Sequence, residues 1–562
     1  MLEAKALKVL RSGLLILAVV TTLWMAPYSS LDPVSLPKMS VLVFLSVLLS
    51  GIWLPRITYF IQGKFQLVTA LALVFTSLLI LIVCFSGSGI WLQIYGTYGR
   101  NTGALTYLAL VLLLLSTAIA TDKYFLEKIL QSLVALGVVL VIYGQIQHQG
   151  WDPLPFQNAY ENNVFGTLGN PNFMSAFMGM IGVVAIGLSI SGKIPKRIRA
   201  ILLMLSFATL VIVYETDSLQ GFLNFTAGFA SLVILWLFMQ QKKRAAIALS
   251  SVVGAGGGLV FLGLINVGPL ANYLFKGSLE ARGFYWRAGV NMLIDHPLFG
   301  VGMDGYGDWY RRSRTLEDTL VSPYINSDSA HNVFLDIASN GGFPLFVTYL
   351  AILSLVVGAI LRVVKRSKSF NPYFAAAVGG WVAFQAQSLI SINQIGLAIW
   401  GWLLSGLIIG YEISTRNEGE EETKSSNNES RRIEKQRNQV LSSITIVSIF
   451  ASTLMASILS IPPFVAANEF YNALKSGNAL QLQPAAYIKP YDRVRFTFVA
   501  SNLAQNDLND RALIVIRDAV ELFPNSYEAW NILVGLPNAS PQEITRAKAE
   551  MRRLDPHNPD LK

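Results

Sequence analysis

Residues 66–86 read QLVTALALVFTSLLILIVCFS and contain no charged side chain. An α-helix of about 20 apolar residues spans the hydrocarbon core of a membrane, which is roughly 30 Å thick. Comparable apolar runs recur along the chain, and each is long enough to form a membrane-spanning helix. We therefore predict spans at residues 12–27, 38–54, 66–86, 103–120, 126–146, 172–191, 198–214, 219–239, 245–267, 333–363 with an irregular start, 372–391, 394–414 and 441–461.

The composition of the chain agrees with these runs. The 562 residues have a mean hydropathy of +0.48, and 53% are hydrophobic while only 14% are charged. The predicted fold class is therefore all-α: a polytopic membrane protein with about 12–13 transmembrane helices. Cys84 is the single cysteine, and the four histidines show no ligand spacing, so we expect no disulfide, no metal and no cofactor.

Lysine and arginine gather in every second connection between the predicted spans. These basic connections are residues 5–11, 56–64, 123–128, 193–199, 242–244, 362–368 and 416–437. The positive-inside rule predicts that they and the N-terminus are cytoplasmic, with the first span retained rather than cleaved as a signal peptide. This pattern accounts for the net charge of +9, so we expect no nucleic-acid partner.

The same alternation divides the chain into four predicted regions. Residues 1–415 form a transmembrane domain with a large outer loop at 268–332, and residues 416–440 form a charged cytoplasmic linker. The last span is 441–461, and residues 465–562 form a domain outside the membrane. In that tail, prolines at 490, 524 and 556 recur at spacings of 34 and 32 residues, which resembles tetratricopeptide helix pairs. An unspecialised helical cap is the alternative.

Three short outer connections carry polar residues that suit a binding site. Arg100 precedes a span, where its guanidinium could bind an anionic group or simply reach towards the lipid headgroups. Asn170, in GTLGNPNF, opens a helix whose N-terminus could bind an anion or be purely architectural. Gln220, in TDSLQG, lies at membrane depth and could line a cavity or cap the following span.

The long outer loop holds the strongest candidates. Arg282 and Trp286 are four residues apart in RGFYW, so they share one face if this segment is helical. His331 and Asn332 end the loop and begin the next apolar run. An arginine, a glycine-rich turn and a histidine at a helix start together indicate an anion-binding site with a base. Capping of the tenth span is the alternative for His331, and a structural turn is favoured for His296.

The ordered motifs GTLGNPNF, TDSLQG, RGFYW, HPLFGVGMDGYG and AHNVFLDIASNGGFPLF resemble the O-antigen ligase and polymerase superfamily of bacterial membrane glycosyltransferases, some of which carry a tetratricopeptide tail. The resemblance covers roughly residues 80–415. It implies a metal-independent enzyme in the bacterial cytoplasmic membrane. Such an enzyme transfers a glycan from a polyprenyl (undecaprenyl) diphosphate on the outer face to an acceptor hydroxyl, for cell-envelope polysaccharide biosynthesis.

The resemblance also assigns roles to residues. Arg282 would bind the diphosphate, and His331 would deprotonate or hold the acceptor, with Asn332 and Trp286 in support. The family often has an arginine where this chain has Gln220. Diphosphate binding would then need further residues, and the candidates are Asn170 and the arginines Arg100, Arg287, Arg311, Arg312 and Arg314.

Several functions stay open at this level. A polymerase would use the same donor and extend another lipid-linked repeat, whereas a ligase would use an acceptor lipid, protein or wall glycan. The tail weakly favours a ligase that binds an envelope protein. A glycolipid or anion transporter or flippase is the alternative from another class, but the predicted spans are almost free of charge and show no internal repeat. A non-catalytic scaffold is the third possibility.

Overall fold

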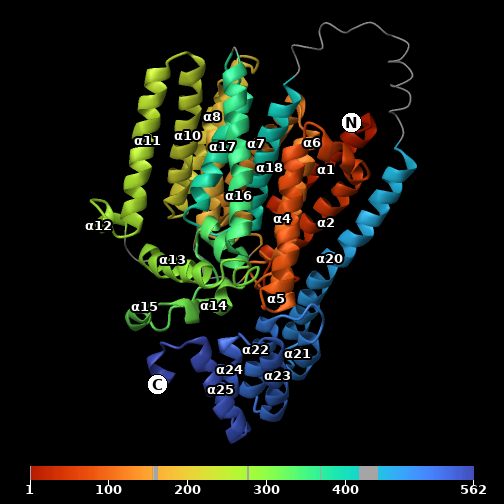
Figure 1. The fold of residues 1–562 in the computed structure, drawn as a ribbon, viewed down its shortest axis with the longest axis vertical. Coiled ribbons are helices and arrows are strands. Elements are labelled where there is room, and N and C mark those ends of the chain that lie inside the picture. The colour runs from red at the N-terminus through yellow and green to blue at the C-terminus, as the bar shows by residue number, and fades with distance from the viewer. Residues whose placement is uncertain are drawn as a thin grey trace.

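The computed structural model describes residues 2–154, 156, 163–274, 278–367, 369–416 and 441–561, and these are helical with connecting turns (Figure 1). Eleven helices in this part of the chain are long and apolar enough to cross a membrane. They are α1 (Ala4–Leu23), α2 (Ser35–Trp53), α4 (Gln66–Phe85), α7 (Lys123–His148), α8 (Pro171–Ser189), α9 (Lys196–Glu215), α10 (Gln220–Met239), α11 (Lys243–Leu264), α16 (Val333–Arg366), α18 (Ile395–Ser414) and α20 (Ser443–Lys475).

Two 17-residue helices, α6 (Ala104–Ala120) and α17 (Pro372–Ser388), occupy the two remaining predicted positions. The all-α polytopic fold predicted from the apolar runs is therefore confirmed. The basic connections among the described residues lie at one end of the bundle, opposite the outer loop and the C-terminal helices (Figure 1). Which end faces the cytoplasm stays a prediction, and the predicted linker lies outside the described residues apart from Arg416.

The centre of the bundle is formed by helices that are buried on every side. The apolar window of α18 is fully buried, whereas α11 at the edge is almost wholly exposed to the surroundings of the bundle. Gly406 and Gly410 of α18 are four residues apart, and a Cβ on either would lie 2.5 Å or less from a backbone carbonyl of α6. This small-residue spacing lets two membrane helices approach closely without a hydrophobic driving force.

A kink divides α16 shortly after it begins. Gly342 has φ 74° and ψ 178°, and Pro344 follows two residues later without a backbone N–H. A left-handed φ favours glycine, and proline removes a helical hydrogen bond, so the regular helix is interrupted here. The predicted irregular start of this span is thus a short helix, beginning at Val333, that meets the long span at an angle.

The glycine-rich loop HPLFGVGMDGYG satisfies the backbone groups that this kink leaves open. The N–H of Val301 donates to the carbonyl of Ser339 at 2.9 Å, and the N–H of Gly302 donates to the carbonyl of Asn340 at 3.0 Å. In return, the N–H of Phe343 donates to the carbonyl of Pro297 at 2.7 Å. Buried backbone groups need such partners, so the motif fixes the start of α16 against the outer loop.

The C-terminal region continues directly from the last span. We predicted that this span ends at residue 461, but α20 runs on through Pro462 and Pro463 to Lys475, because side-chain packing supports the helix past the prolines. Five helices follow, α21 (Ala479–Ala486), α22 (Arg493–Gln505), α23 (Asn509–Leu522), α24 (Tyr527–Gly535) and α25 (Pro541–Leu554).

These helices build a separate apolar core around Trp530, which is 1% exposed. Helix α22 packs on α23, and α24 packs on α25. Such helix pairs suit the repeat spacing noted in the sequence, while the tetratricopeptide likeness itself stays a prediction.

Candidate functional site

The outer loop forms a layer between the helix bundle and the C-terminal domain (Figure 1). It contains α13 (Ser278–Asp295), α14 (Tyr306–Ser313) and α15 (Leu316–Val321), preceded by the short α12 (Ala271–Leu274). Buried apolar side chains, including Met292, Tyr306 and Tyr310, pack this layer into a small core of its own. The loop is therefore a rigid support on which functional side chains can be held.

A cavity of about 510 Å³ opens between this layer and the bundle. Its wall comes from well-separated parts of the chain, namely residues 31–35, 98–100, 102, 107, 156, 168–170, 173, 303–304, 328–329, 331, 336–337, 340 and 392–394. A cavity of this size, with polar groups converging on it, is typical of a small-ligand or substrate site. Of the residues predicted from the sequence, Arg100, Asn170 and His331 line it.

The backbone around His331 is held in an unusual conformation. His331 has φ 53°, and its N–H donates to Ser329 Oγ at 3.2 Å. One residue earlier, the N–H of Ala330 donates to Asp336 Oδ1 at 2.6 Å. Asn332 begins α16 by accepting a hydrogen bond from the N–H of Leu335 at 3.1 Å. Non-glycine residues rarely adopt positive φ, and such strain is often found at functional sites.

Asn332 therefore has the capping role that was the alternative for His331. Its amide nitrogen also donates to the carbonyl of Leu389 at 3.0 Å, which ties the start of α16 to the loop after α17. The imidazole of His331 does not cap α16. Its ring stacks on Tyr285 of α13, with the ring centres 5.4 Å apart and the planes at 27°.

The electrostatic surroundings of His331 favour its neutral form. Burial, together with the positive charges of Arg100 and Arg282, lowers the pKa of His331 to about 3. Burial disfavours the charged form of an imidazole, and a like charge nearby does the same. At physiological pH the ring is therefore neutral, and one of its nitrogens carries a free lone pair.

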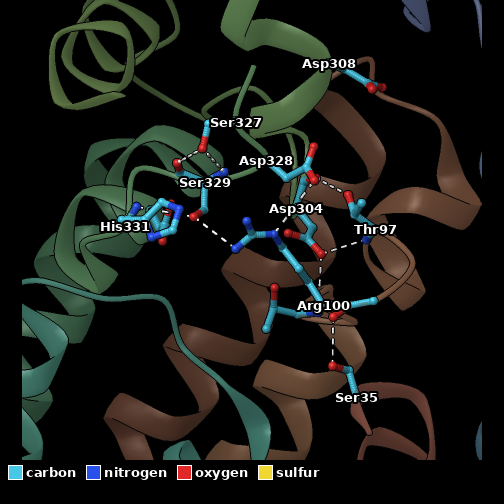
Figure 2. A network of polar contacts seen from close by, with 12 residues as sticks. Ser35, Thr97, Arg100, Asp304, Asp308, Ser327, Asp328, Ser329 and His331 are labelled. Atoms are coloured by element: carbon cyan, nitrogen blue, oxygen red, sulfur yellow. Dashed lines mark hydrogen bonds and ion pairs between the residues drawn. The ribbon is translucent and has the colours of Figure 1, made fainter. Parts of the chain in front are cut away.

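Two arginines supply positive charge near His331: Arg100 lines the cavity, and Arg282 of α13 acts on the imidazole from outside the cavity wall. Arg100 donates from Nη1 to Ser329 Oγ at 3.0 Å, and its Nε lies 3.9 Å from Asp328 Oδ2 (Figure 2). Arg282 is 9% exposed in α13, and no described residue forms a hydrogen bond or ion pair with its guanidinium. Burial lowers the pKa of Arg282 as well. A buried guanidinium without an anionic partner is costly, and a bound anion would relieve that cost.

Asp304 holds the loop that carries Arg100. Its carboxylate accepts the N–H of Thr97 at 2.7 Å and the N–H of Thr102 at 3.2 Å, and the side chain is buried (Figure 2). Burial raises the pKa of Asp304, while the Thr97 N–H and the Arg100 charge act in the opposite direction. Asp304 therefore acts as an anchor for the neighbouring arginine.

Three of the predicted arginines have other partners. Arg287 forms a forked ion pair with Asp318 of α15, with its Nε 3.0 Å and Nη2 2.5 Å from carboxylate oxygens. Arg311 donates to Asp555 at 3.3 Å, and Arg312 donates to Asn525 at 3.0 Å. These contacts join parts of the protein, and the predicted role of the three guanidinium groups in diphosphate binding stays a prediction. Arg314, also considered, donates to both oxygens of Asp555.

The remaining candidates support the fold near the site. Asn170 accepts the N–H of Asn172 at 2.8 Å and so caps α8 at the cavity wall. Trp286 stacks on Phe261 of α11, with ring centres 6.1 Å apart. Gln220 is buried at the start of α10 and is not among the described residues that line this cavity, and its predicted part in donor binding stays a prediction.

Sequence reasoning did not single out several residues that shape the site. Tyr285 contacts His331, and Asp304, Asp328 and Asp336 fix the loops around it. Three of these lay inside quoted motifs, since Tyr285 belongs to RGFYW, Asp304 to GVGMDGYG and Asp336 to HNVFLD. A carboxylate next to a glycine-rich turn or in a first helical turn was the available signal. Asp328, in an ordinary polar loop, carried none.

The bundle and its polar cavity define an integral membrane protein with a site beside the apolar region. Within it, residues 204–350 match the model of the family described as O-antigen ligase, which confirms the resemblance to the O-antigen ligase superfamily. The matched segment contains Arg282 and His331.

The chain is also similar to an uncharacterized protein of Haemophilus influenzae. The two are 23% identical over an alignment of 226 residues that covers 36% of this chain and 54% of that protein. The matched region thus spans about half of the relative's length, and we take no activity from it.

Proposed function

We propose that this protein is a glycosyltransferase of the O-antigen ligase type, acting on the outer face of the bacterial cytoplasmic membrane. It would take a glycan from a polyprenyl (undecaprenyl) diphosphate carrier and join it to an acceptor hydroxyl in polysaccharide biosynthesis. One observation carries the proposal: a neutral imidazole, His331, lies beside the charges of Arg100 and Arg282 at a cavity of about 510 Å³. In this proposal the N-terminus is cytoplasmic and the C-terminal domain lies outside the membrane.

The two arginines would bind the diphosphate of the donor. Guanidinium groups offer donors in a fixed fork that matches phosphate oxygens. Arg282 has no anionic partner among the described residues, and the nearest carboxylate contact of Arg100 is long, at 3.9 Å. Both charges are therefore available to a ligand.

The reaction would use His331 as the general base. The acceptor oxygen attacks the anomeric carbon of the donor glycan, and the new C–O bond forms as the bond from that carbon to the diphosphate oxygen breaks. The acceptor proton passes to the neutral imidazole nitrogen of His331. The electron pair of the broken bond leaves with the diphosphate, whose added negative charge is stabilised by Arg282 and Arg100.

The identity of the acceptor separates a ligase from a polymerase, and both would use this chemistry. Mass spectrometry of polyprenyl-diphosphate-linked glycans tests the proposal in cells that lack the protein, complemented with the wild type or His331→Ala. We expect these glycans to accumulate and only the wild type to remove them. Accumulated single repeats would indicate a polymerase and long chains a ligase. Unchanged lipid-linked glycans in the deleted cells would contradict the proposal.

A further inference from the structure

The C-terminal domain is joined to the outer loop by buried ion pairs. Arg314 of the loop and Asp555 of the domain pair at 3.0 Å, with their side chains 1% and 0% exposed. Arg493, the first residue of α22, forms a close ion pair with Asp308 of α14. Charges as well buried as these need partners, so the domain has a defined position against the loop.

Arg493 also reaches the wall of the catalytic cavity. Its Nη2 lies 3.6 Å from Oδ1 of Asp328, while the Nε of Arg100 lies 3.9 Å from Oδ2 of the same carboxylate. Figure 2 shows Asp328 directly above Arg100, with Ser329 and His331 beside them. One carboxylate is therefore shared between an arginine of the cavity and an arginine of the C-terminal domain.

This sharing affects the charge that the cavity presents. A carboxylate bound closely to Arg100 would neutralise it and would compete with an anionic ligand for the same donors. In the structure, Arg493 holds one oxygen of Asp328, and the short hydrogen bond of Arg100 goes to Ser329 Oγ at 3.0 Å. If Arg493 were removed, Arg100 would be the only one of these two arginines left to pair with Asp328.

The position of Arg100 is linked to that of His331 through the same serine. Ser329 Oγ accepts the hydrogen bond from Arg100 and also the N–H of His331, at 3.2 Å. A shift of Arg100 towards Asp328 would therefore remove a partner from the turn that presents the imidazole. The charge and the geometry of the cavity change together.

We propose that Arg493 is a positioning residue for the transfer reaction: by holding Asp328, the docked C-terminal domain leaves Arg100 free to bind the donor diphosphate. This inference rests on the proposed function for the identity of the anion. According to this proposal, the C-terminal domain contributes to the active site through Arg493. A chain whose domain is displaced from the loop would have Arg100 neutralised by Asp328.

A suppressor experiment with the full-length protein tests the proposal. Arg493→Ala should reduce glycan transfer about 10-fold through a higher KM for the donor, because Asp328 then neutralises Arg100. Asp328→Asn in the same chain should restore most of the lost activity, although the contact with Arg493 is still missing. A purely structural role of Arg493 would not be relieved by this second change. Arg493→Lys should fall between the wild type and Arg493→Ala.

Arg517→Ala is the matched control, since Arg517 forms an exposed ion pair with Glu543 inside the same domain. It should leave transfer unchanged. Thermal unfolding of each variant checks that the domain is folded. Transfer that stays as low in the double variant as in Arg493→Ala would overturn the proposal, and so would full activity in Arg493→Ala.

Binding of inorganic pyrophosphate to the detergent-solubilised full chain separates this inference from the proposed function. Isothermal titration calorimetry should show weaker binding for Arg493→Ala than for the wild type, and recovery in the double variant. This order can hold even if cells show no lipid-linked glycan transfer, in which case only the proposed function fails. Equal pyrophosphate affinity in all variants would overturn the role of Arg493.

Discussion

Two groups of arginines in the same outer layer have different surroundings. Near His331, Arg282 has no hydrogen bond or ion pair from a described residue, and Arg100 has one long contact with a carboxylate. At the junction with the C-terminal domain, Arg311 and Arg314 both bind Asp555, a side chain that is 0% exposed. Among the described residues, the first group has no close carboxylate partner, whereas the charges of the second group are paired within the protein.

The difference shows that pairing, rather than residue type, separates an anion site from a docking contact. A guanidinium with a buried carboxylate at 3.0 Å is electrostatically satisfied. One that is buried beside a neutral imidazole is not, and it gains from binding phosphate oxygens. The following changes test whether the two groups are really distinct.

The largest effect is expected at the base. His331→Ala should reduce glycan transfer by about 1,000-fold, because no other group at the cavity is a neutral imidazole. Quantification of lipid-linked glycans by mass spectrometry measures this loss. His296→Ala is the control, since the ring of His296 packs on Trp309 at 4.4 Å in the outer layer. Near-normal transfer by His331→Ala would remove the base from the mechanism.

Arg282→Ala should reduce glycan transfer about 100-fold, because the variant loses a guanidinium that stabilises the leaving diphosphate. Arg287→Ala, five residues away on the same helix, should change it no more than about 2-fold, since Arg287 pairs with Asp318 and does not line the cavity. Initial rates with purified donor and acceptor provide the comparison. If the two variants were equally impaired, the distinction between a ligand-binding and a paired arginine would be wrong.

Removal of one docking partner should have a smaller effect on transfer and a clear effect on the domain. Arg314→Ala leaves Asp555 buried without its forked partner, which costs about 3–5 kcal/mol. We expect faster hydrogen exchange in α25 and transfer reduced about 10-fold, as the domain leaves the loop. Hydrogen exchange with mass spectrometry reports this, with Arg517→Ala as the control. Unchanged exchange in α25 would show that Arg314 does not hold the domain.

The smallest effect concerns pH. The pKa of His331 is lowered from 6.5 to about 3 in the folded protein, so the unfolded chain takes up this proton first as the pH falls. Stability should therefore decrease between pH 6.5 and pH 5, before most carboxylates are protonated. Thermal unfolding of His331→Ala should show a shallower pH dependence than the wild type. Parallel curves would contradict a neutral, buried imidazole.

Much of the fold could be predicted because membrane spans are a local property. A run such as residues 66–86 must be helical in a bilayer, where every backbone group needs a partner within its own segment. The last span was the exception, because we took Pro462 as an end and α20 continues to Lys475. Proline lowers the stability of a helix, but packing of α20 against its neighbours, notably α2, supports the continuation.

The candidate site was only partly predictable. His331 and Arg100 line the cavity and Arg282 lies near the same imidazole, as their motifs suggested, although their roles stay proposals. The sequence could not distinguish these arginines from Arg311 or Arg312. The partners of Arg311 and Arg312 lie far away in the chain, so these contacts cannot be predicted from local sequence. Arg311 meets Asp555, 244 positions later.

The sequence alone determined that this chain is a helical membrane protein, which residues cross the apolar region and which side chains are suited to bind an anion. These properties follow from runs of about 20 residues and from local motifs. The tertiary structure alone decided which arginines remain available, because that depends on contacts such as Arg493 with Asp328 across more than one domain. Electrostatic pairing depends on distance in space, and only the folded chain defines that distance.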